Sequence, residues 1–179
     1  MEKKLKGKKV AILVADGFEQ VELTEPKKAL EEAGAITEIV SPADNEVQGW
    51  NHDDKADSFP VDMPLSRARS DDYDALLLPG GVRNPDQLRT MVRAVEFIDG
   101  FFATGKPVII EEMFPLHCSP EELGQFIERS KAQQLAAGWI GFYWGKTPDE
   151  YRRSGTIIDT ITLSWLELFQ QRRAAVLGR

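Results

Sequence analysis

The chain has 179 residues, of which 42% are hydrophobic and 28% charged, and this is the composition of one globular domain with its own core. Its formal net charge of −7 argues against nucleic acid and anionic membrane surfaces as partners. A single cysteine, Cys118, excludes an internal disulfide framework and favours a cytoplasmic protein. The basic N-terminus precedes an apolar run that is too short for a signal peptide or a membrane span, so neither is expected.

Strand and helix patterns alternate along the chain. Short apolar runs predict buried strands at 10–14, 36–40, 75–78, 108–110 and 138–144. Helical patterns occupy 20–33, 84–103, 119–135 and 156–172; Pro26 predicts a late start or a kink in the first, and Asn84 is expected to cap the second. Residues 45–64 have no helical period and predict a hairpin or excursion with its turn at 51–54. The pattern predicts an α/β fold over 1–179, a single domain with a five-stranded, mostly parallel sheet between helices.

In such sheets, ligands bind where the strands end at their carboxyl edge. Three loops fall at this edge, namely 16–19, 79–82 and 111–118. In the second of them, Gly80 and Gly81 have two alternatives, an anion cradle before the next helix or a plain strand-to-helix turn.

Three motifs carry a resemblance to a known family. They are Ala15-Asp16-Gly17-Phe18-Glu19-Gln20-Val21-Glu22, Asp74-Ala75-Leu76-Leu77-Leu78-Pro79-Gly80-Gly81 and Gly105-Lys106-Pro107-Val108. In this order and spacing, residues 9–108 resemble the ThiJ/PfpI superfamily. The resemblance implies a flavodoxin-like three-layer sandwich, frequent homo-oligomers, and relatives that are glyoxalase- or deglycase-like enzymes, peptidases or stress proteins. It also implies that Glu19 hydrogen-bonds a nucleophilic cysteine and that the backbone at Gly80 and Gly81 helps to form an oxyanion hole.

The chain departs from that family at its catalytic position. By residue count after Gly-Lys-Pro-Val, Glu112 stands where the family has cysteine, and Met113 where it has histidine. A carboxylate can attack a glycosyl or phosphoryl centre but does not replace a thiolate. Cys118 follows His117 directly, and adjacent side chains usually diverge, so a loop thiol is favoured over a working pair.

A second resemblance begins at the same strand. Residues 106–170 resemble the last two strand–helix units of retaining glycoside hydrolases built on the (β/α)8 barrel, and the match implies Glu112 as nucleophile. Trp139, Tyr143 and Trp144 would then form a sugar platform, with aromatic packing as the alternative. A glycosidase needs a second carboxyl, and the barrel's Asn-Glu-Pro motif is missing, so glycoside hydrolysis is not expected.

The two resemblances together place Glu19 opposite Glu112. Two carboxylates in contact would share a proton, and the alternative is that Glu112 turns to solvent. His52 has no cysteine or second histidine nearby, so neither a metal nor a cofactor is expected. The last helix is apolar over more than one face, which indicates burial by the sheet and by a partner subunit, as in a homodimer.

The favoured prediction is a chimeric or designed scaffold, with 106–179 derived from a barrel, that has no inherited catalytic function. One alternative is an enzyme acting on small carbonyl or sugar substrates through Glu19 and Glu112. The other is a non-catalytic oligomeric stress or binding protein. Whether the chain is an enzyme stays open, and its small-molecule ligand is unknown.

Overall fold

The computed structural model describes residues 3–113, 121–122, 124–125, 128–129, 138–141, 148–154, 156, 159–160, 163–164, 166–168 and 171. For Glu112, Met113 and residues 138–141 the description covers the backbone. The chain forms two compact units: Met1–Met113 with Gln133–Ile140, and Phe114–Ala132 with Gly141–Arg179. A single domain over the whole chain remains a prediction.

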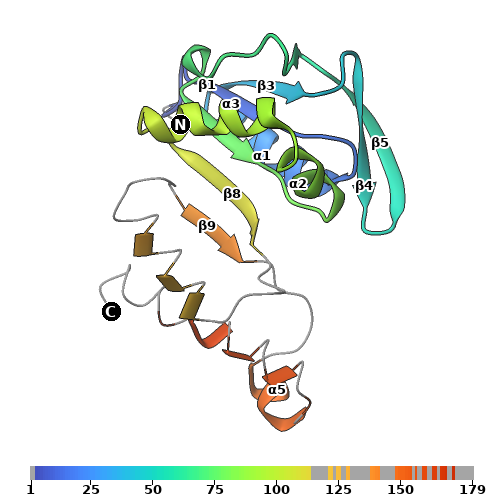
Figure 1. Ribbon diagram of the computed structural model, residues 1–179, viewed down its shortest axis with the longest axis vertical. Coiled ribbons are helices and arrows are strands. Elements are labelled where there is room, and N and C mark those ends of the chain that lie inside the picture. The colour runs from blue at the N-terminus through green and yellow to red at the C-terminus, as the bar shows by residue number, and fades with distance from the viewer. Residues whose placement is uncertain are drawn as a thin grey trace. The chain divides into compact units, whose positions relative to one another are not determined.

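The first unit is built on a six-stranded sheet with the order β6-β3-β1-β7-β8-β9 (Figure 1). Its strands are β1 (Lys9–Leu13), β3 (Ile36–Ser41), β6 (Met63–Pro64), β7 (Ala75–Leu78), β8 (Val108–Met113) and β9 (Gly138–Gly141). Four pairs of neighbouring strands are parallel: β1 with β3, β1 with β7, β3 with β6, and β7 with β8. Apart from the two-residue β6, these are the five strands expected, and the flavodoxin-like α/β fold is confirmed.

Two hydrophobic clusters lie on opposite faces of this sheet. Helix α1 (Gln20–Glu32) covers one face, where fully buried Leu23 packs with Ile12 of β1. Helices α2 (Arg83–Leu88) and α3 (Val92–Ala103) cover the other face, where Phe97 and Phe101 are fully buried. Because β1 is buried by both clusters, its sequence is apolar without alternation, as a central parallel strand requires.

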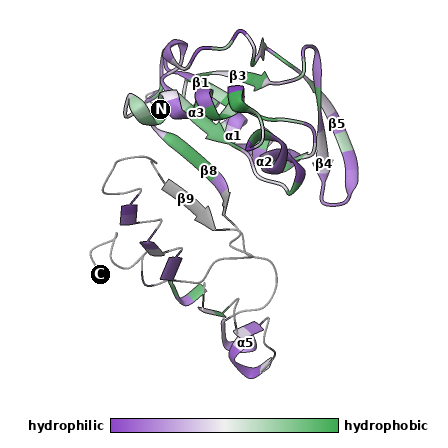
Figure 2. Ribbon diagram, viewed as in Figure 1, coloured by the Kyte–Doolittle hydropathy of each residue, from purple (hydrophilic) through white to green (hydrophobic). Residues whose placement is uncertain are grey.

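The predicted excursion is an antiparallel hairpin of β4 (Glu46–Asn51) and β5 (Asp54–Pro60), with its turn at residues 52–53. Its β4 pairs with the short β2 (Phe18–Glu19), which makes a second, three-stranded sheet. The register shifts between Gln48 and Trp50, as at a β-bulge. Figure 2 shows that the hairpin is largely hydrophilic, in contrast to the apolar β8.

One of the two alternatives for Pro26 does not hold, and two other predictions about helices were wrong. Helix α1 begins at Gln20 and runs through Pro26, so the late start does not occur; Leu23 and Leu30 pack against the cluster before and after the proline and hold the helix. Instead of one helix over 84–103, α2 ends at Leu88 and α3 begins at Val92. The break contains Thr90, whose hydroxyl donates to Gln87 O at 2.8 Å and so competes for a helical carbonyl.

Asn84 was also misread, because Val82 is the capping residue of α2. Asn84 is buried inside the helix, where its Oδ1 accepts from Ala15 N at 2.7 Å and its Nδ2 donates to Pro79 O at 2.7 Å. The side chain therefore ties the loop after β1 to the loop after β7. A short 3-10 helix, η1 (Ser70–Asp72), precedes β7.

In the second unit, the structure adds helix α5 (Pro148–Ser154), which the sequence pattern did not predict. The expected helices at 119–135 and 156–172 are described in part: each described residue of the first is helical, as is each described residue of the second after Thr156. Residues 142–144 of the last expected strand lie outside the described residues.

Candidate functional site

The loop after β1 places Glu19 beside the hairpin. Its Oε2 accepts a hydrogen bond from the backbone N–H of His52 at 3.1 Å, in the turn between β4 and β5. His52 has a φ of 56°, an uncommon backbone conformation for a residue with a side chain. The carboxylate of Glu19 therefore has a described partner in the hairpin turn. Its predicted contact with Glu112 concerns a side chain outside the described residues and remains a prediction.

A different glutamate reaches the strand edge from the first turn of α1. The Oε2 of Glu22 accepts a hydrogen bond from Gly80 N at 2.6 Å, directly after β7. An anion cradle was one of the two alternatives for Gly80 and Gly81, and the Gly80 amide binds an anionic group of this chain itself. A short bond from an amide to a carboxylate is charge-assisted, so it fixes Glu22 at this place.

Gly81 is required by its backbone and by its surroundings. Its φ is +89°, and an added Cβ would lie 2.8 Å from Glu19 N and 3.0 Å from Gly17 O. No side chain fits there without moving the backbone of the loop after β1. The Gly80–Gly81 turn and the loop after β1 thus form one closely packed edge.

Glu111 of β8 is the second carboxyl at this edge. Its Oε2 is fully buried, and among the described residues it has no hydrogen-bond partner. Burial, followed by the negative charge of Glu22, raises the pKa of Glu111 to about 8. At neutral pH the Glu111 side chain is therefore mainly the carboxylic acid, in the electrostatic field of Glu22.

Alternation along β8 explains why Glu111 lies on the same face of the sheet as α1, which carries Glu22. Ile109 packs against the cluster on the α1 face of the sheet, whereas Val108 and Ile110 pack against the cluster on the α3 face. Successive side chains of a strand point to opposite faces, so Glu111 shares the α1 face with Ile109. Figure 2 shows the corresponding change from hydrophobic to hydrophilic at the end of β8. This alternation, combined with the position of α1, is the signal that could have identified the pair.

The other predicted site residues divide into backbone positions and residues that are not described. Glu112 lies in β8 and Trp139 in β9, each with its backbone described. Four further candidates, the sugar-platform residues and the predicted loop thiol with its neighbour, lie outside the described residues: Tyr143, Trp144, Cys118 and His117. Within the part of the chain that the structure describes, no cluster of histidine, cysteine or acidic side chains could hold a metal ion.

The sequence pattern of the DJ-1/PfpI family matches residues 8–110, which is more than half of the chain. The chain belongs to the DJ-1/PfpI family. Its resemblance to this family, also called ThiJ/PfpI, is thereby confirmed for the front part. The matches show neither a glycoside hydrolase segment nor a chimeric or designed origin.

Relatives of this DJ-1/PfpI protein occur in Staphylococcus and Bacillus species. An uncharacterized protein of Staphylococcus epidermidis is 51% identical over 82 residues, which cover 46% of this chain and 45% of that protein. The Bacillus subtilis protein named "Putative cysteine protease YraA" is 44% identical over 102 residues, covering 56% of this chain and 57% of that protein. The chain thus spans about half the length of the curated relatives it matches.

Solved structures support the fold of this DJ-1/PfpI protein. The VC2308 protein is similar with a TM-score of 0.55 at 24% identity, over 65% of this chain and 58% of that one. A cysteine-to-alanine mutant of the DJ-1 superfamily protein STM1931 from Salmonella typhimurium has a TM-score of 0.51 at 19% identity, over 96% and 91%. Among the described residues, no helix is long and apolar enough to cross a membrane.

Proposed function

We propose that this DJ-1/PfpI protein has no cysteine-dependent catalytic function. Carboxyl groups take the place of the family's nucleophilic cysteine at the edge of the sheet formed by the carboxyl ends of its strands. The observation that carries the proposal is Glu112, which stands where the family resemblance places the nucleophilic cysteine. The single cysteine, Cys118, follows the segment that the family pattern matches. A cytoplasmic location, inferred from this one cysteine, is part of the proposal.

The chemistry of the two groups supports this conclusion. A thiolate is a strong nucleophile toward carbonyl carbon, and its reactivity depends on a lowered pKa in an electropositive site. A carboxylate is a weak nucleophile toward such a centre, and it would repel the oxyanion that forms in the attack. The glyoxalase- or deglycase-like reactions of the family are therefore not expected.

The decisive experiment compares turnover of methylglyoxal by the parent chain and by Cys118→Ser. We expect no turnover from either protein, with both melting cooperatively as folded proteins. Turnover by the parent chain that Cys118→Ser abolishes would overturn the proposal, because the displaced cysteine would then do the work of the family nucleophile.

A second candidate function is general acid–base catalysis by Glu22 and Glu111. It is favoured by the buried, unpartnered carboxyl oxygen of Glu111 and by the raised pKa of that group, to about 8. A carboxylic acid beside a carboxylate can donate a proton to one atom of a substrate and accept one from another. Small carbonyl compounds and sugars are the substrate class that would use such a pair.

The test of this second function is a panel of methylglyoxal and aryl glycosides. Activity that disappears in both Glu22→Gln and Glu111→Gln, and persists in the exposed-site control Glu46→Gln, would support it. The predicted pair of Glu19 and Glu112 is tested in the same panel by the corresponding glutamine variants. Activity that none of the four site variants changes would exclude carboxyl catalysis at this edge.

Two finer proposals depend on residues 106–179. The resemblance of residues 106–170 to a glycoside hydrolase barrel, and the end of the family match at residue 110, support a separate origin for this segment. Aryl glycoside turnover lost in Glu112→Gln would support descent from such an enzyme. The alternative of an oligomeric binding protein predicts a homodimer in analytical ultracentrifugation, together with ligand binding and no turnover.

A further inference from the structure

A cavity of about 290 Å³ lies apart from the glutamate pair, within the first unit. Three elements form its walls: the loop after β1 with Asp16, the hairpin with Trp50 and Lys55, and helix α2 with Arg83 and Gln87. Neither Glu22 nor Glu111 lines it. Its volume is at the lower end of the range for small-molecule sites.

Hydrogen bonds hold the three walls in fixed positions. Asp16 joins them, because its Oδ1 accepts from Gln48 N at 2.8 Å and its carbonyl accepts from Gln87 Nε2 at 2.7 Å. Gly17 N also donates to Gln48 O at 2.9 Å. The walls are therefore positioned before a ligand arrives, which lowers the entropic cost of binding.

A glycine permits the approach of Arg83 to the loop. Gly17 has a φ of +87°, and an added Cβ would lie 2.6 Å from the Cβ of Arg83. The stem of Arg83 thus packs where a side chain on the loop would otherwise be. From there its guanidinium lies 4.0 Å from the centre of the Trp50 ring, in a cation–π contact.

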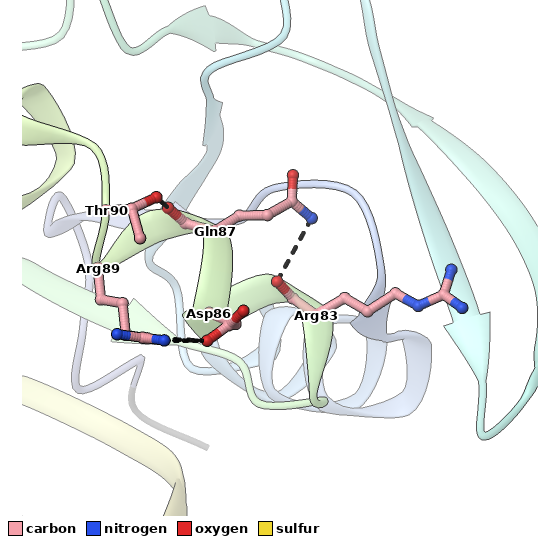
Figure 3. A network of polar contacts seen from close by, with 5 residues as sticks. All are labelled: Arg83, Asp86, Gln87, Arg89 and Thr90. Carbon is pink, nitrogen blue, oxygen red and sulfur yellow. Dashed lines mark hydrogen bonds and ion pairs between the residues drawn. The ribbon is translucent and has the colours of Figure 1, made fainter.

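The two cations of the cavity lack acidic partners. By contrast Arg89, the residue directly after α2, is paired: its guanidinium donates from Nε to Asp86 at 2.8 Å (Figure 3). In the same view the side chain of Arg83 extends away from these residues, and only its backbone carbonyl is bonded, accepting from Gln87 Nε2 at 3.3 Å. Among the described residues, neither Arg83 nor Lys55 has an ion pair or a side-chain hydrogen bond. Two unpaired cations at one cavity are notable in a chain with a net charge of −7.

We propose that this cavity binds a small planar monocarboxylate. Arg83 presents a flat fork of N–H donors that matches the two oxygens of a carboxylate, and Lys55 adds a second positive charge. Asp16 leaves a net charge of about +1 in the walls, which suits one negative charge better than the two of a phosphate monoester. The Trp50 ring favours a flat group that can stack beside the guanidinium.

The test measures binding of benzoate to the full chain by calorimetry and by the NMR shift of the Trp50 indole N–H. We expect saturable binding that weakens at least about tenfold in Arg83→Gln, since a hydrogen bond to a charged group contributes that much. Lys55→Gln should weaken it less. The matched control is Arg89→Gln, an arginine that is paired and outside the cavity, and its binding should equal that of the parent chain.

Comparator ligands separate the parts of the proposal. Cyclohexanecarboxylate has the same charge without the flat ring, and inorganic phosphate has more charge without the ring; both should bind more weakly than benzoate. Equal binding of cyclohexanecarboxylate would overturn the planar requirement, and tighter binding of phosphate would overturn the choice of carboxylate. Absent binding of benzoate, or binding that Arg83→Gln leaves unchanged in a folded variant, would overturn the site. Glu111→Gln should not alter the affinity, so this result is independent of the carboxyl chemistry proposed above.

Discussion

The buried carboxyl of Glu111 should make the stability of the protein depend on pH, and a Glu111→Gln substitution should remove that dependence. In the folded protein the pKa of Glu111 is raised from its ordinary value of 4.5 to about 8, by burial and then by the charge of Glu22. Between these pH values the folded protein holds a proton that the unfolded chain has released. The free energy of unfolding therefore falls as pH rises through this range, and the loss is complete above the folded pKa.

The size of the effect follows from the shift and from the exposure of the group. Each pKa unit corresponds to about 1.4 kcal/mol, so a fully shielded carboxyl with this shift would account for about 5 kcal/mol. The Glu111 side chain is only partly buried, and solvent screening reduces this to about 2 kcal/mol. Glutamine carries no charge to desolvate, so Glu111→Gln should be about 2 kcal/mol more stable than the parent chain at pH 9 and equal to it near pH 5.

The assay is urea unfolding at half-unit steps from pH 5 to pH 9, followed by far-UV circular dichroism. The difference between the parent chain and the variant is the quantity of interest, because titrating groups that do not interact with Glu111 contribute equally to both. Glu46→Gln, an exposed glutamate of β4, is the control and should give a flat difference. A flat difference for Glu111→Gln as well would refute the reasoning, since it would mean that Glu111 titrates alike in the folded and unfolded chain.

Three further predictions concern the edge and the core. Glu22→Gln should move the pKa of Glu111 down toward its ordinary value, as measured by carboxyl ¹³C NMR. An unchanged titration midpoint of Glu111 would contradict this prediction. Asn84→Ala leaves two buried backbone groups unpaired and should cost about 2 kcal/mol in urea unfolding; a cost near zero would mean that water replaces the side chain. Phe97→Ala should cost about 4 kcal/mol, and a much smaller loss would show that the cluster collapses around the gap.

The apolar runs of the sequence were sufficient to predict the main sheet. Strands such as β1 and β7 are buried on both faces, so burial appears directly as an unbroken hydrophobic stretch. The hairpin was predicted from the lack of helical period at 45–64 and from its polar turn. The break between α2 and α3 was missed because no glycine or proline marks it, and the local signal is the weak one of a threonine hydroxyl bonding a carbonyl.

The sequence predicted the right region for the candidate site but not the glutamates Glu22 and Glu111. Counting along motifs selected Glu19 and Glu112, but counting does not say which face of a strand or helix a side chain occupies. Glu22 lies almost one helical turn after Glu19, and only the docking of α1 on the sheet brings it to Gly80 and toward Glu111. Asn84 resembles a helix cap in sequence, and its bonds to two loops depend on long-range packing that no local pattern encodes.

The hairpin is more exposed than the parallel sheet, and this difference determines which positions of the protein can change over generations. The outer strand β5 has no buried residue, and its side chains are exposed except for the half-buried Ala56 and Phe59. Substitutions at its exposed positions, including Lys55, should cost the fold little, because exposed positions usually tolerate change. Ligand preference could therefore drift by mutation of one surface strand while the parallel sheet stays under constant selection for packing.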